Sequence, residues 1–180
     1  MKKTGVNKKR LTGAVLTAVF SALLCVLSPL TLPLFGVPLT LAVFAVCCIS
    51  TVLGKKGVIS LLLYIVIGAA GLPVFAAFTG GIGVLTGPTG GFILGYIPIA
   101  LLCGYASEKQ KNIYASVGLS LLGLLICYIA GAGVYIYVTK TPLLQGLTAS
   151  VFPFIIPDII KIIAGVFCGR KIKALLQKSA

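Results

Sequence analysis

Two charged side chains stand three residues apart in the last long apolar run of the chain. The stretch reads PDIIKIIAG, residues 157–165, and its Asp158 is one of only two acidic residues in the sequence. On a helix, this spacing places Asp158 and Lys161 on one face, close enough to pair. A carboxylate accepts N–H donors and an ammonium binds a carboxylate. The pair therefore has the chemistry to bind a small polar solute.

Three interpretations of this pair are open. It could be a structural ion pair that neutralises itself, but apolar residues often replace a buried pair without loss of stability. Asp158 could instead carry protons, although no second carboxylate lies within an apolar run to relay them. Ionisable residues inside a membrane are functional candidates by default, and a solute-binding pocket is the leading interpretation.

The remaining reactive side chains exclude most enzyme classes. The chain has no histidine, which removes zinc-protease helices and Ser-His-Asp triads. Its six cysteines show no CxxC spacing and read as packing residues rather than a disulfide framework or a metal site. The second acid, Glu108, is most simply a solvated surface charge. We therefore expect no enzyme activity, no catalytic residues and no metal site.

A second unusual segment is the glycine block TGGIGVLTGPTGG, residues 79–91. Six of its thirteen residues are glycine, three are threonine and none is charged. We expect no stable helix here, because glycine disfavours helices, and irregular backbone at a membrane must be buried in protein or line a cavity. The block is not a Walker phosphate loop, since no lysine lies between Lys56 and Lys109. Any ATP-derived energy must come from another protein.

Long apolar runs form the elements that must position these residues. Hydrophobic residues make up 59% of the chain and charged ones 9%, against roughly 45–50% and about 25% in soluble domains. A membrane-crossing helix needs about 20 residues, and the second, third and fourth runs reach this only with their flanks. The sequence predicts an all-α integral membrane protein with six transmembrane helices, five being the fallback. The runs cover residues 11–30, 39–53, 57–71, 92–106, 113–138 and 151–169.

The positions of the charges fix the expected topology. A net charge of +13 would suggest nucleic acid in a soluble protein. With six spans and a cytoplasmic N-terminus, however, only Lys140 lies in an external loop and only Lys161 lies within a span, while thirteen basic residues face the cytoplasm. By the positive-inside rule both termini are cytoplasmic. We expect a basic cytoplasmic tail (residues 1–10), one transmembrane domain (residues 11–178), and the lipid bilayer, not nucleic acid, as surroundings. At about 1.5 Å per residue, Asp158 lies about 10 Å and Lys161 about 15 Å below the outer end of the last span.

The first span carries small residues at a strict four-residue spacing, Ala14, Ala18 and Ala22. On a helix they stack on one face, where another helix can approach closely. From the pattern alone, ordinary internal packing is favoured over a partner contact.

The block GLPVF…GGIGVLTGPTGGFILGY, residues 71–96, followed by PFIIPDIIK, residues 153–161, resembles the BioY family. These are the biotin-specific substrate-binding (S) components of energy-coupling factor (ECF) vitamin transporters. The resemblance implies an S-component-like bundle that captures biotin from outside with high affinity. It also implies delivery through a transmembrane scaffold subunit and two ATPase subunits in a bacterial plasma membrane, with no cofactor bound by the chain itself.

The resemblance implies roles for particular residues as well. By chemistry the ureido N–H groups of biotin suit Asp158 and its carboxylate suits Lys161, and which charge meets which end stays open. Phe75 or Phe78 would pack on the apolar body. Glycine-block residues complete the expected site: Thr79, Gly80, Gly81, Pro88 and Thr89. In related S components an alanine-spaced first helix contacts the scaffold, which makes the strip of Ala14, Ala18 and Ala22 a partner interface. The alternatives are an S component for another vitamin and a self-sufficient ion-coupled carrier.

Overall fold

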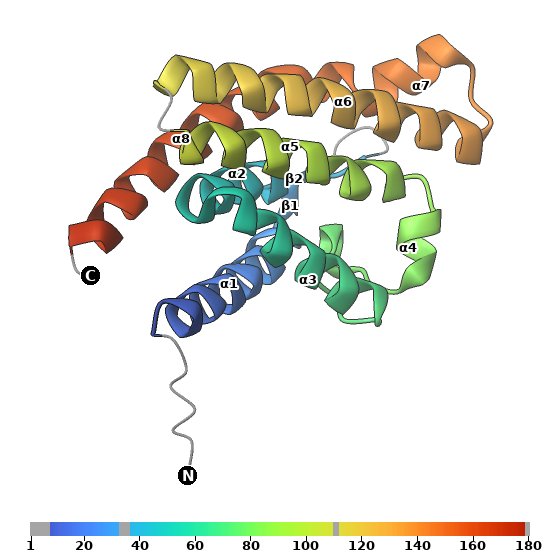
Figure 1. Cartoon of the computed structure of the whole chain (residues 1–180). Helices are drawn as coiled ribbons and strands as arrows, with labels where there is room; N and C mark the ends of the chain where they lie inside the picture. Colours follow the sequence, from blue (N-terminus) through green and yellow to red (C-terminus); the bar gives the residue numbers. More distant parts are fainter. Residues whose placement is uncertain (1–7, 33–36, 110–111, 179–180) are drawn as a thin grey trace.

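Helices make up most of the described chain (Figure 1). The computed structural model describes residues 8–32, 37–109 and 112–178. Each predicted run overlaps one of the six longest helices, which confirms the all-α architecture with six transmembrane helices. Residues 1–7 of the predicted tail lie outside the described residues, and Lys8 already belongs to the first helix. These helices are α1 (Lys8–Leu27), α2 (Ala42–Leu53), α3 (Gly57–Ala69), α5 (Gly90–Glu108), α6 (Ile113–Thr139) and α8 (Ile155–Lys178).

The second and third helices are too short to cross a bilayer unaided. At about 1.5 Å per residue, the 12 residues of α2 and the 13 of α3 leave part of a hydrocarbon core of roughly 30 Å to their flanks. Between them the 3₁₀ helix η1 (Gly54–Lys56) reverses the chain, and Gly54 has a positive φ of 65°. By length and apolarity alone, residues 42–69 count as one segment, and the described residues then hold five candidate spans. The reversal at η1 divides this segment into two crossings.

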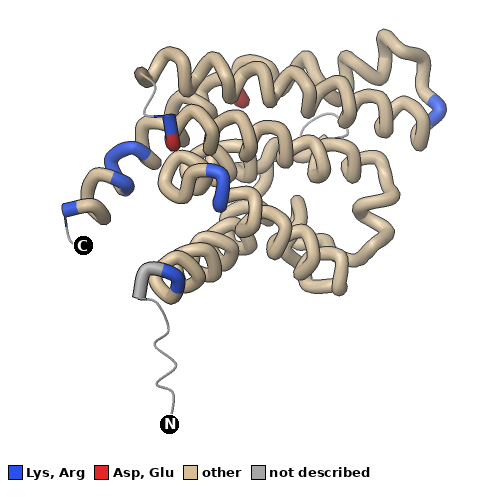
Figure 2. Tube along the Cα trace, in the orientation of Figure 1, with Lys and Arg blue, Asp and Glu red and all other residues tan. Residues whose placement is uncertain are grey.

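Basic residues gather at one end of the bundle (Figure 2). This is the end where α1 begins, α8 ends and η1 carries Lys55 and Lys56. Lys140 follows α6 at the opposite end. The arrangement obeys the positive-inside rule and puts both ends of the described chain on the cytoplasmic side.

Glu108 is more than the solvated charge that the sequence suggested. Its Oε1 accepts the backbone N–H of Lys55 at 2.8 Å, while its side chain stays 43% exposed. The neighbouring Ser107 accepts from the ammonium of Lys173 at 2.8 Å, through its hydroxyl oxygen. These contacts tie α5 to η1 and to α8 at the cytoplasmic end.

Glycines bring the main helix pairs together. A Cβ at Gly165 of α8 would lie 2.6 Å from the carbonyl oxygen of Phe44 in α2. Likewise, a Cβ at Gly123 of α6 would lie 2.7 Å from Cα of Ile99 in α5. Small residues at such crossings let helix backbones approach closely in membranes. The α2–α8 contact places the start of α8 beside the chain segment that leads into α2.

Short elements connect the helices at the end away from the basic residues. Two strands pair antiparallel before α2, with Thr31 opposite Thr40 and Leu32 opposite Leu39. A further short helix precedes α8 and was not predicted. The short elements are β1 (Thr31–Leu32), β2 (Leu39–Thr40), η2 (Ala76–Phe78), α4 (Ile82–Thr86), α7 (Leu143–Ser150) and η3 (Phe152–Phe154).

The glycine block contains helical structure, so the expectation of no helix was wrong in part. Residues 82–86 form α4, and Gly90 and Gly91 are the first residues of α5. Gly81, with a φ of 97°, turns the chain into α4, and its N–H donates to the Gly68 carbonyl at 2.7 Å. The helix covers only the five residues between Gly81 and Gly87, where the block holds a single glycine. Its attachment to α3 makes the block a packed element.

The last span begins later than predicted and continues further. Residues 152–154 form η3, and α8 extends past Gly169 to Lys178. Asp158 therefore lies in the first turn of α8, and Lys161 about 9 Å from the start of the helix at about 1.5 Å per residue. The pair is nearer the outer end of its helix than the run of residues 151–169 suggested. The positive end of the helix dipole also stabilises a carboxylate in the first turn.

Candidate ligand-binding site

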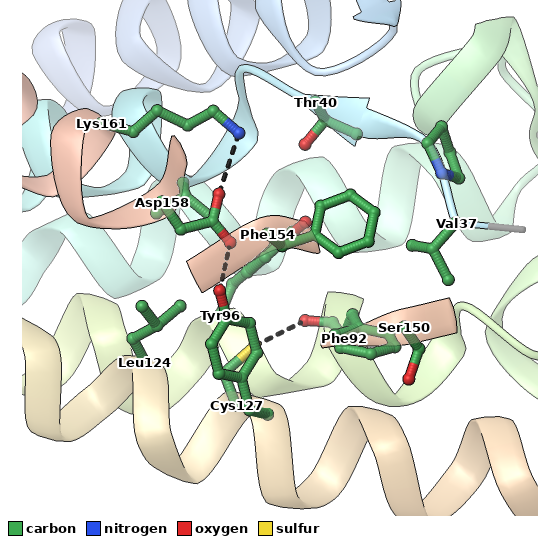
Figure 3. A pocket seen from close by; sticks show the side chains of 13 residues that line it. Val37, Thr40, Phe92, Tyr96, Leu124, Cys127, Ser150, Phe154, Asp158 and Lys161 are labelled. Carbon is green, nitrogen blue, oxygen red and sulfur yellow. Dashed lines mark hydrogen bonds and ion pairs between the residues drawn. The ribbon is translucent and has the colours of Figure 1, made fainter. Parts of the chain in front are cut away.

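Asp158 and Lys161 meet inside the bundle (Figure 3). The Lys161 ammonium donates to Asp158 Oδ1 at 2.9 Å, and the two side chains are 12% and 8% exposed respectively. The hydroxyl of Tyr128, on α6, donates to Asp158 Oδ2 at 2.9 Å. Both carboxylate oxygens are therefore hydrogen-bonded, as a buried charge requires.

A small cavity of about 40 Å³ lies beside this pair. Ligand sites usually hold roughly 300–1,000 Å³, so a ligand would have to widen it. Its walls come from elements far apart in the sequence and are mostly apolar (Figure 3). Asp158 and Lys161 are the charged residues among those that line it. The lining residues are Val37, Pro38, Thr40, Val43, Phe92, Tyr96, Leu124, Cys127, Tyr128, Ser150, Phe154, Asp158 and Lys161.

Aromatic rings form much of the cavity wall. Phe92 and Tyr96 lie one turn apart on α5, Tyr128 is on α6, and Phe154 is on η3. Phe92, Tyr96 and Phe154 are each at most 9% exposed. Such rings offer broad apolar surfaces with a hydroxyl at the edge of each tyrosine. The cavity is therefore suited to a flat, largely apolar ligand body with polar groups at its ends.

A second cavity of about 30 Å³ adjoins the first and shares Val37, Pro38, Thr40, Phe92 and Tyr96 with it. Its other side carries a hydroxyl pair, because the Ser28 and Tyr64 oxygens lie 2.6 Å apart. Thr89, from the glycine block, lines this second cavity. The block therefore borders the larger ligand space through Thr89.

The other predicted glycine-block residues do not line either cavity. Thr79 and Pro88 are exposed. A Cβ at Gly80 would collide with the Leu72 carbonyl oxygen, while Gly81 turns the chain before α4. Gly81 attaches the loop to α3 through its hydrogen bond to Gly68, and contact of these four residues with a ligand stays a prediction.

The two phenylalanines predicted to bind the ligand lie on either side of a turn in the backbone. Phe75 is completely buried; its ring fills the notch at Gly68 and packs edge-on against Tyr64, with ring centroids 5.4 Å apart. Ala77 and Phe78 have positive φ angles of 55° and 57°, and Phe78 is 65% exposed. Neither phenylalanine lines the cavity beside Asp158.

Sequence reasoning missed most of the cavity wall. Tyr96 ends the quoted glycine-block stretch and Phe154 is the second residue of the one around Asp158, so both stand close to residues that were singled out. Tyr128 gave no local signal, because thirty residues separate it from Asp158. Thr40 reaches the cavity from β2, whose pairing was not predicted.

The alanine strip lies on the surface of the bundle. Ala14, Ala18 and Ala22 are all exposed, so they do not serve the internal packing that the pattern alone favoured. A groove of about 410 Å³ runs beside the strip between α1 and α3. Its lining residues are Arg10, Gly13, Ala14, Thr17, Ala18, Lys56, Ile59 and Leu63.

Comparisons with known proteins agree with this architecture. The family model described as "BioY family" matches residues 1–178. The chain is 36% identical over 158 residues to "Biotin transporter BioY" of Thermotoga maritima, covering 87% of this chain and 93% of that protein. It is 35% identical over 174 residues to "Biotin transporter BioY2" of Lactococcus lactis subsp. cremoris, covering 94% and 95%. A crystal structure described as the S-component for biotin from an ECF-type ABC transporter superposes with a TM-score of 0.84, at 25% identity over 94% of each chain. The chain belongs to the BioY family.

Proposed function

We propose that this chain is the high-affinity biotin-binding S component of an ATP-driven ECF vitamin importer. The observation that carries the proposal is the Asp158–Lys161 pair in a cavity with aromatic walls, in the outer part of α8. The names of the similar proteins and of the similar structure support the same ligand and transporter class. On this proposal the chain is not an enzyme, and it captures biotin from outside the cell.

Biotin offers a partner for each feature of the cavity. A carboxylate has about four acceptor positions, and Tyr128 and Lys161 occupy two of those of Asp158. The remaining positions can accept the ureido N–H groups. The apolar bicyclic body suits Phe92 and Tyr96. The valerate carboxylate suits the ammonium of Lys161, which has three N–H donors.

The present geometry also requires a movement on binding. The Lys161 ammonium and Asp158 Oδ1 are 2.9 Å apart, whereas the ureido and carboxylate ends of an extended biotin are much farther apart. Both ends can meet their partners only if the flexible lysine side chain swings away from Asp158. We therefore infer that the carboxylate of biotin competes with Asp158 for Lys161.

Energy for transport would come from other subunits. The sequence has no Walker phosphate loop, and an exposed alanine strip with an adjacent groove suits a docking helix. We infer a transmembrane scaffold subunit that contacts Ala14, Ala18 and Ala22, and two ATPase subunits. On this proposal residues 11–178 form the one transmembrane domain of a multi-pass protein in a bacterial plasma membrane, without a cofactor of its own.

Equilibrium binding to the purified chain in lipid nanodiscs tests the proposal. We expect nanomolar biotin binding, on the scale where 1 nM corresponds to about −12.3 kcal/mol. Failure to bind biotin, with nanomolar binding of another vitamin, would contradict the proposed ligand. Flux driven by an ion gradient in liposomes that hold this chain alone would instead favour a self-sufficient carrier.

Variants of the pair test the site itself. Asp158→Asn and Lys161→Ala should each raise the biotin Kd at least about 30-fold, because removing one partner of a desolvated charge pair costs roughly 2–5 kcal/mol. Lys140→Ala is the matched control, since Lys140 lies beyond α6 and lines neither cavity. Unchanged affinity in both pair variants would show that Asp158 and Lys161 have a purely structural role.

A further inference from the structure

Lys161 borders a third space besides the cavity. A groove of about 310 Å³ lies on the side of β1, β2 and the start of α2. It shares Lys161 and Thr40 with the cavity beside Asp158, and these two residues lie on the same side of that cavity (Figure 3). The groove is lined by Leu30, Thr31, Leu39, Thr40, Leu41 and Lys161.

The groove and the cavity differ in chemistry. Three leucines and two threonines line the groove, and Lys161 is the charged residue among its lining residues. The far side of the cavity is enclosed by Phe92, Tyr96 and Phe154, all buried. A ligand held with its carboxylate at Lys161 would therefore have packed side chains around its ring end and an apolar groove beyond its tail.

We propose that the site also accepts biotin derivatives extended from the carboxyl group by a linear amide, such as ε-N-biotinyl-lysine. This inference rests on the proposed function and names its substrate class more fully. The amide carbonyl would accept a hydrogen bond from Lys161, and the methylene chain of the extension would lie against Leu30, Leu39 and Leu41. Burial of these methylene groups against the leucines is favourable and offsets part of the loss of the carboxylate–ammonium contact.

Continuity and charge favour this occupant over a lipid chain. The groove meets the cavity at the cation that would bind the ligand tail, whereas an acyl chain alone has no group for that cation. Substituents on the ureido ring have no such space, because Asp158 and Tyr128 are in direct contact there. The site should thus tolerate extension at one end of the ligand and reject it at the other.

The test compares three ligands on the full chain in nanodiscs: biotin, ε-N-biotinyl-lysine, and biotin methylated on a ureido nitrogen. We expect the biotinyl-lysine Kd to lie within about tenfold of that of biotin, and the methylated ligand to bind at least about a hundredfold more weakly. A biotinyl-lysine Kd more than about tenfold above that of biotin overturns the inference. Failure of biotin itself to bind defeats the proposed function instead.

Groove variants locate the extension. Leu41→Trp and, independently, Leu30→Trp should change the biotin Kd by less than about threefold and raise the biotinyl-lysine Kd about tenfold or more, because the indole ring would fill the groove that the extension must occupy. Leu125→Trp, at an exposed leucine of α6 that lines neither space, should change neither. Equal effects on both ligands, or none on biotinyl-lysine, would show that the groove does not hold the extension, as expected if lipid occupies it.

Discussion

At the scale of single residues, Asp158 and Lys161 neutralise each other at a site where either alone would be an unpaired buried charge. Their contact of 2.9 Å is supported by Tyr128. A buried pair of this kind often adds little net stability, yet breaking it by removing one partner is costly. Stability and binding should therefore respond differently to single and double substitutions.

Lys161→Met should lower the free energy of unfolding by about 3 kcal/mol, because it leaves Asp158 buried without its cation. The double variant Asp158→Asn/Lys161→Met should recover most of this stability while biotin binding stays lost. Thermal unfolding and biotin titration in the same detergent measure the two effects. If the double variant regained affinity together with stability, the pair would have no direct role in recognition.

At the scale of elements, the α2–α8 crossing controls the shape of the cavity. α8 carries Asp158 and Lys161, and Thr40 lies just before α2. Gly165 sets their separation, since a Cβ there already meets the Phe44 carbonyl. Any side chain at this position must push the two helices apart.

Gly165→Leu should therefore lower the unfolding temperature and raise the biotin Kd about tenfold or more, at the roughly 1–3 kcal/mol typical of overpacking. Gly118→Leu is the control, because a Cβ at Gly118 in α6 would have no neighbour within 4 Å. Biotin titration and thermal unfolding of both variants check this. Equal losses at the two positions would contradict a specific role for the α2–α8 crossing.

At the scale of the whole molecule, capture and delivery should use opposite parts of the bundle. The ligand cavity lies among β2, α2, α5, α6 and α8, whereas the exposed alanine strip lies on α1. The groove beside that strip includes residues of α1 and α3. Binding and energised uptake should thus be separable by mutation.

Ala18→Leu should change the biotin Kd by less than about threefold and strongly impair ATP-driven uptake with the partner subunits. The reason is that a large side chain on a small-residue strip prevents close helix approach. Ala130→Leu, on the exposed side of α6, is the matched control. Uptake is measured in liposomes that hold the chain with its partner subunits. Normal uptake by the Ala18 variant would show that the strip is not part of the partner interface.

The sequence predicted the six helices and the topology because both depend on local signals. Long apolar runs and the side on which lysines and arginines fall can be read one segment at a time. The division of residues 151–169 between η3 and α8 was missed, since apolarity alone does not distinguish a 3₁₀ turn from an α-helix. The helix at residues 82–86 was missed because the prediction rested on the glycine content of the whole block, and this short segment holds only one glycine.

The charged pair could be identified from the sequence because ionisable residues are rare in this chain, but the cavity wall could not. Tyr128, Phe154 and Thr40 reach the cavity from three separate elements. Their convergence depends on helix crossings set by contacts such as that of Gly165 with Phe44. Phe75 shows the converse, since it lies in the recognisable stretch and yet fills a notch at Gly68.

The one-to-one balance of charge in the cavity has an electrical consequence for transport. Asp158 and Lys161 sum to zero, and they are the charged groups among the lining residues. An anionic ligand therefore gives the occupied site a net charge of one unit negative. Carrying that charge inward against an interior-negative membrane potential costs up to about 2.3 kcal/mol per 100 mV. The loaded site would thus be held toward the outside by the membrane voltage, and the energy that turns it inward must exceed this amount.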